Sequence, residues 1–370
     1  MNGKVIAAGH ICLDITPVFP AGRACGKPED LLIPGKLIRM EQADVHTGGS
    51  VANTGLALKI LGNDVTLLGK VGDDDFGRMI AQILKRYGAG GLITDPGSST
   101  SYSVVLALPG IDRIFLHHPG ANDTFSNADI PEEMLQDAVL FHFGYPPIMR
   151  RMYENDGDEL AAVFRRVKAH GIATSLDLAA VDADTDAGRA DWRRILGKVL
   201  PDVDFFLPSF EELCFMLDPE KYRRMSASGG DMTERLDPEN DVDPLIDMLM
   251  DMGCKTVVVK CGKAGMVWRT ADEKTLQMTG ERLPLNIPEW AGKQGRQPCF
   301  RADTVKSATG AGDTSIAAFL TAVLQGRMPE TCAALAAAEG ACAVTAYDAL
   351  SGLQPLNQLE TRIRNGWETM

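Results

Sequence analysis

Residues 309–315 read Thr-Gly-Ala-Gly-Asp-Thr-Ser, and residues 316–320 continue as Ile-Ala-Ala-Phe-Leu, a run with helical character. A turn of small residues that opens a helix leaves several backbone N–H groups unpaired and pointing the same way, which favours a bound anion. A phosphate there would repel the carboxylate of Asp313 unless that carboxylate served the reaction. Taking a proton from an alcohol as phosphate arrives is the role that fits, so the stretch indicates a small-molecule kinase. A glycine-containing N-cap whose Asp complements the helix dipole is the alternative for this turn.

Three further turns carry residues that suit ligand binding. Residues 47–55 (Thr-Gly-Gly-Ser-Val-Ala-Asn-Thr-Gly) open a predicted helix, on which Asn53 offers a donor and an acceptor to sugar-type hydroxyls. Residues 208–212 (Pro-Ser-Phe-Glu-Glu) directly follow a predicted strand, where open α/β sheets bind ligands and where one or two carboxylates would hold a Mg²⁺–water shell. Residues 260–265 (Lys-Cys-Gly-Lys-Ala-Gly) could wrap a nucleotide. The structural alternatives are a tight turn with a surface Asn, an ordinary capping box and a strand-to-strand turn.

The composition bounds the class of protein. The chain has 370 residues, 45% of them hydrophobic and 24% charged, which is ordinary for a globular protein with one large domain and an accessory piece. Its net charge of −13 argues against nucleic acid as a partner, although a local backbone nest could still bind a nucleotide. No apolar run approaches membrane-spanning length, and the eight scattered cysteines include no Cys-x-x-Cys pair. We therefore expect buried free thiols, no membrane partner and a cytoplasmic setting.

Predicted strands and helices alternate along the chain. Strands are expected over residues 4–9, 65–71, 138–143, 172–178, 203–207 and 255–260, and helices over 74–87, with an apolar stripe from Phe76 to Tyr87, and over 160–170. This alternation is typical of right-handed βαβ crossovers. It predicts an α/β fold with a doubly wound, mostly parallel sheet and helices on both faces.

Two segments break this alternation. Residues 11–47 are rich in Pro and Gly, with strand-like ends at 11–18 and 36–45, and residues 101–118 alternate like a hairpin with its turn at 109–112. Neither can be a βαβ unit, so we expect them to pair as a small separate sheet that serves either as a lid or as a structural edge. Residues 222–244 are polar and predict an exposed insertion, and residues 282–303 predict a long irregular connection.

Several motifs of other enzyme classes are missing from the sequence. No Gly-Lys pair is followed by Ser or Thr, which excludes a P-loop. The first strand leads to Gly9-His10-Ile11 rather than to a Gly-x-Gly-x-x-Gly fingerprint, and no Gly-x-Ser-x-Gly elbow lies between a strand and a helix. A Rossmann-type dinucleotide fold and an α/β hydrolase are therefore disfavoured.

The glycine-rich turns and the alternating strands and helices, in their order along the chain, resemble the ribokinase-like (PfkB) carbohydrate kinase family. The resemblance extends over nearly the whole chain. Residues 48–53 (Gly-Gly-x-x-Ala-Asn), 61–62 (Leu-Gly) and 69–77 (Gly-Lys-Val-Gly-Asp-Asp-x-Phe-Gly) are similar to its N-terminal signature, and residues 309–314 to its C-terminal one. The resemblance implies a doubly wound α/β core with a small β-sheet lid. It also implies transfer of the ATP γ-phosphate to a hydroxyl of a sugar, nucleoside or related molecule. The core would comprise residues 1–10, 48–100 and 119–370, and the lid residues 11–47 and 101–118.

The resemblance assigns roles to residues by their position. Asp313 matches the catalytic base, and Gly310, Ala311 and Gly312 match the anion hole. The residues on the substrate side are Asp14, Gly48, Gly49, Asn53 and Asn122, the last in the stretch 119–122 where the lid returns to the core. Those on the nucleotide side are Ser209, Gly262, Gly265 and Thr309, and Glu212 matches the acid that organises Mg²⁺ through water.

The sequence departs from the family pattern at three places. Ser209 stands where the family usually has Asn, which predicts weakened or water-mediated phosphate and metal contacts. Ser307-Ala308-Thr309 replaces the common Asp-Thr-Thr, whose Asp helps to hold an activating monovalent cation in many relatives, so K⁺ activation is in doubt. The loop over residues 280–303 is longer than the family norm.

The leading hypothesis is an ATP- and Mg²⁺-dependent kinase of a sugar or sugar-like compound, working as a homodimer through the lid. A nucleoside kinase of the same fold would need an apolar platform for the base, and Phe19, Tyr102 and Phe115 are candidates for it. A relative that binds a sugar without phosphorylating it and a nicotinamide-dependent oxidoreductase are further alternatives.

Overall fold

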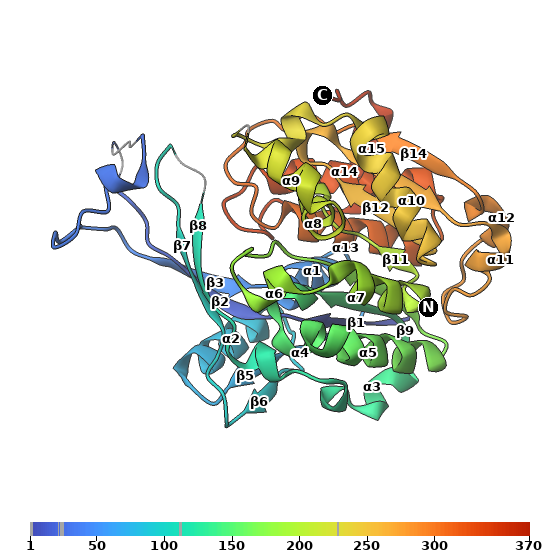
Figure 1. Ribbon diagram of the computed structural model, residues 1–370, viewed down its shortest axis with the longest axis horizontal. Helices are drawn as coiled ribbons and strands as arrows, with labels where there is room; N and C mark the ends of the chain where they lie inside the picture. The colour runs from blue at the N-terminus through green and yellow to red at the C-terminus, as the bar shows by residue number, and fades with distance from the viewer. Residues whose placement is uncertain (1–2, 21, 23–25, 111–112, 228) are drawn as a thin grey trace.

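The computed structural model describes residues 3–20, 22, 26–110, 113–227 and 229–370. Its main body has three layers, with helices on both sides of a central sheet, and a narrow second sheet extends from one side of it (Figure 1). Cys25 and residues 111 and 112 of the predicted hairpin turn lie outside the described residues.

The central sheet has eight strands in the order β14-β13-β12-β11-β10-β9-β1-β4. The strands from β12 to β4 run parallel, and β13 and β14 add an antiparallel edge. The predicted mostly parallel sheet is therefore confirmed. The strands are β1 (Lys4–Gly9), β4 (Val65–Leu68), β9 (Ala138–Gly144), β10 (Ala173–Asp177), β11 (Phe205–Phe206), β12 (Thr256–Lys260), β13 (Met266–Thr270) and β14 (Gln294–Gln297).

Both faces of the sheet are covered, because alternate residues of each strand point to opposite sides. In β1, Val5 and Ala7 belong to one hydrophobic core, whereas Ile6 and Ala8 belong to the other. The first core is closed by α1 (Ser50–Ile60), α2 (Asp75–Arg86), α13 (Ala311–Leu324), α14 (Pro329–Ala343) and α15 (Leu356–Arg364). The second is closed by α3 (Glu132–Gln136), α4 (Arg150–Tyr153), α5 (Asp158–Ala169), α7 (Trp192–Val199), α8 (Phe210–Leu217) and α10 (Asp243–Asp251). The doubly wound arrangement predicted from the sequence is thus observed.

Two local predictions need correction. The segment 65–71 is not one strand: it divides into β4 and β5 (Lys70–Gly72), and β5 pairs with β6 (Ile93–Asp95) in a separate two-stranded sheet. The chain leaves the main sheet at Gly69, where a Cβ would lie 2.8 Å from a methyl carbon of Ile11. On α2, Ile80 and Leu84 are buried as predicted, but two members of the expected stripe, Met79 and Tyr87, are exposed.

The second sheet, here called the side sheet, joins the two segments that break the alternation. Its order is β3 (Asp44–Gly48), β2 (Cys12–Thr16), β7 (Tyr102–Leu106) and β8 (Ile114–His118), with β2 and β7 parallel and the outer pairs antiparallel. The predicted pairing of residues 11–47 with 101–118 is therefore present. The strand-like end predicted at 36–45 begins only at Asp44, and Leu37 is fully exposed.

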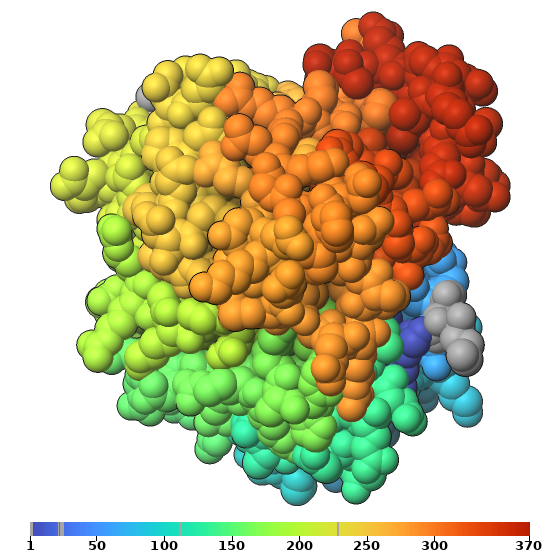
Figure 2. Space-filling view, turned by 90° about the vertical axis from the view of Figure 1, so that its right-hand side faces the viewer, coloured from blue at the N-terminus to red at the C-terminus, as the bar shows by residue number. Residues whose placement is uncertain are grey.

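The two expected insertions are more ordered than predicted. Residues 219–226 form α9 (Pro219–Ser226), and Thr233 is buried against the turn after β12. The 282–303 connection contains α12 (Ile287–Trp290) and β14, which extends the main sheet. The segment from about residue 271, which includes α11 (Glu273–Leu276), forms the middle of the face opposite the side sheet (orange in Figure 2). Among the described residues, no helix is both long and apolar enough to cross a membrane.

The start of α13 depends on a close packing contact. Gly310 is the N-cap, with a left-handed φ of 73°, and a Cβ there would lie 2.2 Å from the Cβ of Ala349. Ala349 belongs to the 344–354 loop after α14. The carbonyl of Val344 in this loop also accepts hydrogen bonds from the N–H groups of Lys306 and Ser307. This loop therefore supports the turn that leads into α13.

A buried glutamate on α14 also holds this loop in place. Glu339 on α14 is fully buried, and its Oε1 accepts a hydrogen bond of 2.8 Å from the backbone N–H of Gln354. Its Oε2 has no hydrogen-bond partner among the described residues. Burial raises the pKa of Glu339 from its ordinary 4.5 to about 8, because only the Gln354 N–H stabilises the charged form.

Replacing Gly310 should cost more stability than replacing a glycine that has space around it. Gly310→Ala combines a left-handed backbone, which costs about 1–2 kcal/mol, with a clash that costs about 1–3 kcal/mol more. Gly326→Ala, at the other end of α13, is the matched control because Gly326 has a φ of 71° and no atom within 4 Å of an added Cβ. Urea unfolding of both variants measures the difference. Equal losses would contradict tight packing against Ala349.

Glu339→Gln should change how stability depends on pH. A carboxyl whose folded pKa is raised stabilises the fold fully below its unfolded pKa, and this contribution disappears as pH rises through the folded pKa. Between about pH 4.5 and 8, the wild-type protein should lose about 1.4 kcal/mol per pH unit that the variant retains. Unfolding free energies across this range, with Glu330→Gln on the same helix as control, test the expectation. A constant difference between variant and wild type would contradict it.

Candidate active site

The carboxyl ends of the parallel strands meet at the edge of the main sheet that faces the side sheet (Figure 1). Ligands of open α/β sheets bind at this edge. Tyr145 follows β9, Asp177 ends β10 and Lys260 ends β12, while the N-terminal turns of α1 and α13 come to the same edge. The candidate site is built around these residues.

Asp313 is the centre of the site. It lies in the first turn of α13, is only 4% exposed, and accepts hydrogen bonds from three side chains. Asn53 Nδ2 and the Tyr145 hydroxyl donate to its Oδ2 at 3.0 and 2.7 Å, and the Thr54 hydroxyl donates to its Oδ1 at 3.0 Å. Two of these donors come from α1 and one follows β9, so the carboxylate is fixed from two directions.

Tyr145, the donor that follows β9, lies in an unusual backbone conformation. Its φ of 67° and ψ of 39° place a non-glycine residue in the left-handed region, which is costly and is common at functional sites. Burial, followed by the charge of Asp313, raises the pKa of Tyr145 well above its ordinary value. The phenol therefore stays protonated and donates to Asp313 at all working pH values.

The first turn of α13 presents free backbone donors beside this carboxylate. The first i to i−4 bond of the helix runs from Thr314 N–H to Gly310 O, so the N–H groups of Gly312 and Asp313 have no helical acceptor. Small residues at 310–312 leave the turn open, and the nearest side-chain atom to a Cβ built on Gly312 is Lys260 Nζ, at 3.6 Å. The predicted anion cradle is thus adjacent to an ammonium group.

Lys260 forms a nearly buried ion pair with Asp177. Nζ lies 2.8 Å from Asp177 Oδ1, and the two side chains are 14% and 3% exposed. Burial raises the pKa of Asp177, with Lys260 opposing, and the charges of Glu212 and Asp313 add to the rise. Burial alone would lower the pKa of Lys260, but Asp177 and then Glu212 outweigh it, so the pKa is raised. The lysine is therefore firmly protonated among three carboxyl groups.

On the side-sheet flank, Asp14 faces the Gly48-Gly49 turn. A Cβ on Gly48 would lie 2.1 Å from Asp14 Oδ2, and one on Gly49 would lie 2.6 Å from His10 Nδ1, so both glycines are required for this packing. Burial raises the pKa of Asp14, and the charge of Asp313 contributes to the rise. The two carboxylates therefore influence each other across the site.

Two neutral imidazoles lie next to this turn. The rings of His10 and His117 are 5.1 Å apart, and their nearest hydroxyl partners are Ser101, 3.4 Å from His10 Nε2, and Ser103, 3.0 Å from His117 Nδ1. Burial, then His117, lowers the pKa of His10, and burial, then His118, lowers the pKa of His117 to about 4. His10 Nδ1 is buried without a hydrogen-bond partner among the described residues.

Ser209 and Glu212 form the capping box that was the structural alternative for their turn. The Ser209 hydroxyl accepts from Glu212 N–H, and Glu212 Oε2 accepts from Ser209 N–H at 2.8 Å. The cap occupies one oxygen of Glu212. The other carboxylate oxygen of Glu212 is a hard ligand of the kind that Mg²⁺ prefers. The residue therefore fits a magnesium site in which water lies between the carboxylate and the metal.

The other residues predicted for the nucleotide side lie in turns at the same edge. Gly262 (φ 53°) and Gly265 (φ 90°) flank a short 3₁₀ turn between β12 and β13, and a Cβ on Gly265 would lie 2.1 Å from Gln297 O. The strand-to-strand turn is therefore observed, immediately after Lys260. Thr309 N–H donates to the Ser307 hydroxyl at 3.1 Å, directly before the cradle.

Asn122 does not join the predicted substrate group. It is fully buried, its Nδ2 donates to Ile11 O and Pro119 O, and its Oδ1 accepts from Ile11 N–H. Because its amide is committed to the backbone, the residue ties the two segments of the side sheet together where they leave the core. These hydrogen bonds give Asn122 a structural role, and a role in substrate binding stays a prediction.

Tyr145 and Asp177 were not predicted from the sequence, and Lys260 entered the prediction only as the first residue of the 260–265 turn. Each stands at or near the carboxyl end of a predicted apolar strand. That position is itself a signal, because strand ends of a parallel sheet converge at the ligand edge.

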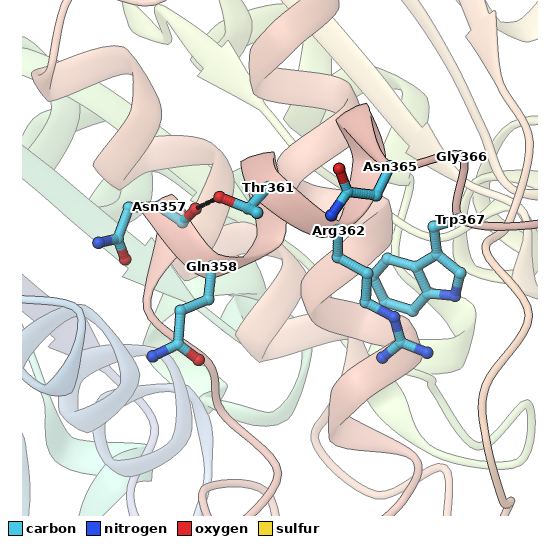
Figure 3. A pocket seen from close by; sticks show the side chains of 7 residues that line it. All are labelled: Asn357, Gln358, Thr361, Arg362, Asn365, Gly366 and Trp367. Atoms are coloured by element: carbon cyan, nitrogen blue, oxygen red, sulfur yellow. Dashed lines mark hydrogen bonds between the residues drawn. The ribbon is translucent and has the colours of Figure 1, made fainter.

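A separate hollow of about 460 Å³ is lined only by residues 357–367, on and just after α15 (Figure 3). Arg362 stacks over the Trp367 ring at 3.6 Å and pairs with Asp303 at 2.7 Å, so its charge is already neutralised. This hollow shares no residue with the site around Asp313.

Known proteins resemble this chain in sequence and in structure. Fructokinase-1 of Oryza sativa subsp. japonica is 29% identical over 144 residues, 38% of this chain and 41% of that relative, so the match spans about two fifths of the relative's length. Fructokinase-2 of the same plant is 26% identical over 280 residues, 74% of this chain and 69% of the relative. A crystal structure of fructokinase with bound ATP from Xylella fastidiosa superposes with a TM-score of 0.71 over 99% of both chains at 20% identity, which shows the shared fold.

The sequence pattern described as pfkB family carbohydrate kinase matches residues 23–355, nearly the whole chain. This match includes both signatures recognised in the sequence, and the predicted family and fold class are confirmed. The chain belongs to the pfkB family of carbohydrate kinases.

Proposed function

We propose that this protein is an ATP-dependent kinase that transfers the γ-phosphoryl group to a hydroxyl of a carbohydrate or sugar-like small molecule. One observation carries the proposal: the carboxylate of Asp313 lies beside unpaired N–H groups in the same helical turn. A base for an alcohol and a cradle for the incoming phosphate are thus joined in four residues. Family membership and similarity to fructokinases support the same activity.

In this mechanism, Asp313 accepts the proton of the acceptor hydroxyl as its oxygen attacks the γ-phosphorus. The amides of the 310–312 turn and of Asp313 stabilise negative charge on the transferred oxygens. Asp14, Asn53 and the Gly48-Gly49 backbone orient the sugar, and the turn at Gly262 and Gly265, with Ser209 and Thr309, borders the nucleotide.

Mg²⁺ would neutralise phosphate charge when bound, with Glu212 holding it through water. K⁺ is not part of the proposal, because Ser307 carries no charge and its hydroxyl donates to Thr309 Oγ1 at 2.9 Å.

The side sheet acts as the lid in this proposal. The lid comprises residues 11–47 and 101–118, and the core comprises residues 1–10, 48–100 and 119–370. Closure would exclude water, which otherwise competes as phosphoryl acceptor.

Phe115 and Leu116 on β8 are more than half exposed, which supports a homodimer formed through this sheet. The cysteines in the described residues are all free, which supports a reducing, cytoplasmic setting.

A neutral sugar fits the acceptor site better than a nucleoside. Of the aromatic residues suggested as platforms for a base, Tyr102 is packed between Phe76 and His118, and Phe115 is 54% exposed. The groups next to the glycine turn are instead a carboxylate and neutral imidazoles, which exchange hydrogen bonds with hydroxyls.

Wild-type protein should release ADP from ATP and Mg²⁺ in the presence of a neutral sugar, whereas Asp313→Asn should turn over about 10²–10⁴ times more slowly because the base is lost. A coupled ADP assay over fructose, ribose, other hexoses and nucleosides measures both. A saturating sugar, at a hundred times its Kd, should also raise stability by about 2.7 kcal/mol.

Asp75→Asn is the control, because Asp75 lies in the first turn of α2 but is exposed and paired with Arg78. Turnover only with nucleosides would favour the nucleoside kinase, and sugar binding without turnover would favour a non-catalytic relative. Binding of NAD without ADP release would support the oxidoreductase, and unchanged turnover in Asp313→Asn would remove Asp313 from the role of base.

Tyr145→Phe should lower kcat/KM by about tenfold or more. The phenol donates to Asp313 Oδ2 at 2.7 Å, and a hydrogen bond to a charged group contributes about 1.5–3 kcal/mol. Without it the carboxylate keeps only the donors from α1 and is held less firmly toward the acceptor hydroxyl. Values of kcat/KM for wild type, Tyr145→Phe and the remote control Tyr153→Phe test this. An unchanged kcat/KM in Tyr145→Phe would mean that the phenol does not help to position Asp313.

A further inference from the structure

Lys260 is a cation beside the proposed phosphate site in the first turn of α13, and the mechanism above gives it no role. It is the last residue of β12, and its Nζ is the nearest side-chain atom to the open face of Gly312 in the first turn of α13. The neighbouring residue across the parallel bridge is Ser209, whose hydroxyl is occupied by the α8 cap. Lys260 is therefore the side chain best placed to reach an anion bound by the amides of α13.

The ammonium of Lys260 has more donors than its neighbours use. The carboxylates of Asp177, Glu212 and Asp313 all act on it. Among the described residues, Asp177 is its one side-chain partner at hydrogen-bond distance, at 2.8 Å. Because an ammonium carries three N–H donors, others remain for phosphate oxygens.

A similar lysine at the opposite edge of the sheet shows what a purely structural pair looks like. Lys168 is also 14% exposed and lies 2.9 Å from the fully buried Asp204. There, Asp204 also accepts from the N–H groups of Thr174 and Gly280, and Lys168 donates to Met278 O. That network is closed by backbone groups, whereas in the described part of the chain Lys260 is the one donor to the carboxylate of Asp177.

We infer that Lys260 is a catalytic residue whose ammonium moves from Asp177 to the oxygens of the transferring γ-phosphoryl group. The inference rests on the proposed kinase activity. A bond forms between the acceptor oxygen and the γ-phosphorus while the bond to the β–γ bridging oxygen breaks, and ADP leaves with that electron pair. Asp313 takes the hydroxyl proton, and Lys260 keeps its protons and supplies charge only. Asp177 holds the ammonium in place between turnovers.

Lys260→Met should lower kcat by about 10²–10³, the usual effect of removing one donor at a developing oxyanion. Binding of ATP alone, measured by titration, should weaken less than tenfold. Binding of ADP with fluoroaluminate, which imitates the transferring phosphoryl group, should weaken more than binding of ATP. Lys168→Met is the matched control and should lower stability but leave kcat of the folded protein unchanged.

The single variant also leaves Asp177 buried without its partner, so the double variant Lys260→Met/Asp177→Asn separates the two roles. If Lys260 is catalytic, the double variant regains thermal stability but kcat stays low. Recovery of kcat to within threefold of wild type, or equal weakening of ATP and fluoroaluminate binding, would overturn the inference while leaving the proposed function standing. Absence of turnover by the wild type with every acceptor would overturn both.

Discussion

The hydrogen bonds to Asp313 are the contacts on which the arrangement of the site depends. Asn53 and Thr54 on α1 and Tyr145 after β9 all donate to this one carboxylate, which joins two helices and the sheet edge at a single point. Because α1 also begins at the Gly48-Gly49 turn, the position of this turn is set relative to the first turn of α13. A shift of either helix would break donors to a buried charge, and an unpaired buried charge is strongly unfavourable.

The distribution of charge makes the proposed phosphate site compatible with an acidic protein. The net charge is −13, and three carboxyl groups lie near the proposed transfer point. Backbone dipoles at the start of α13 and one buried ammonium supply the local positive potential. Only glycine fits at positions 48, 49 and 310, because a Cβ there would clash with atoms of Asp14, His10 and Ala349, respectively. These glycines are therefore constrained by packing within the protein itself.

Much of the fold could be predicted from the sequence, and part of the site. The strand–helix alternation and the two glycine-rich signatures are local patterns, so the parallel sheet, the side sheet and the placement of Asp313 and Asn53 followed from them. The pair of Asp177 and Lys260 depends on the order of strands, which no local pattern contains, and Tyr145 depends on a left-handed backbone residue. Asn122 resembled a ligand-binding residue by position, but its environment shows that backbone groups use its whole amide.

The distance along the chain between the two halves of the site has a consequence for biosynthesis. Asn53 and Asp313 are 260 positions apart, and α13 packs against α1. A growing polypeptide can form the first strands early, but it cannot complete the centre until most of its length has left the ribosome. Incomplete chains therefore contain the Gly48-Gly49 turn without the first turn of α13, so Asp313 meets its three donors only when synthesis is nearly finished.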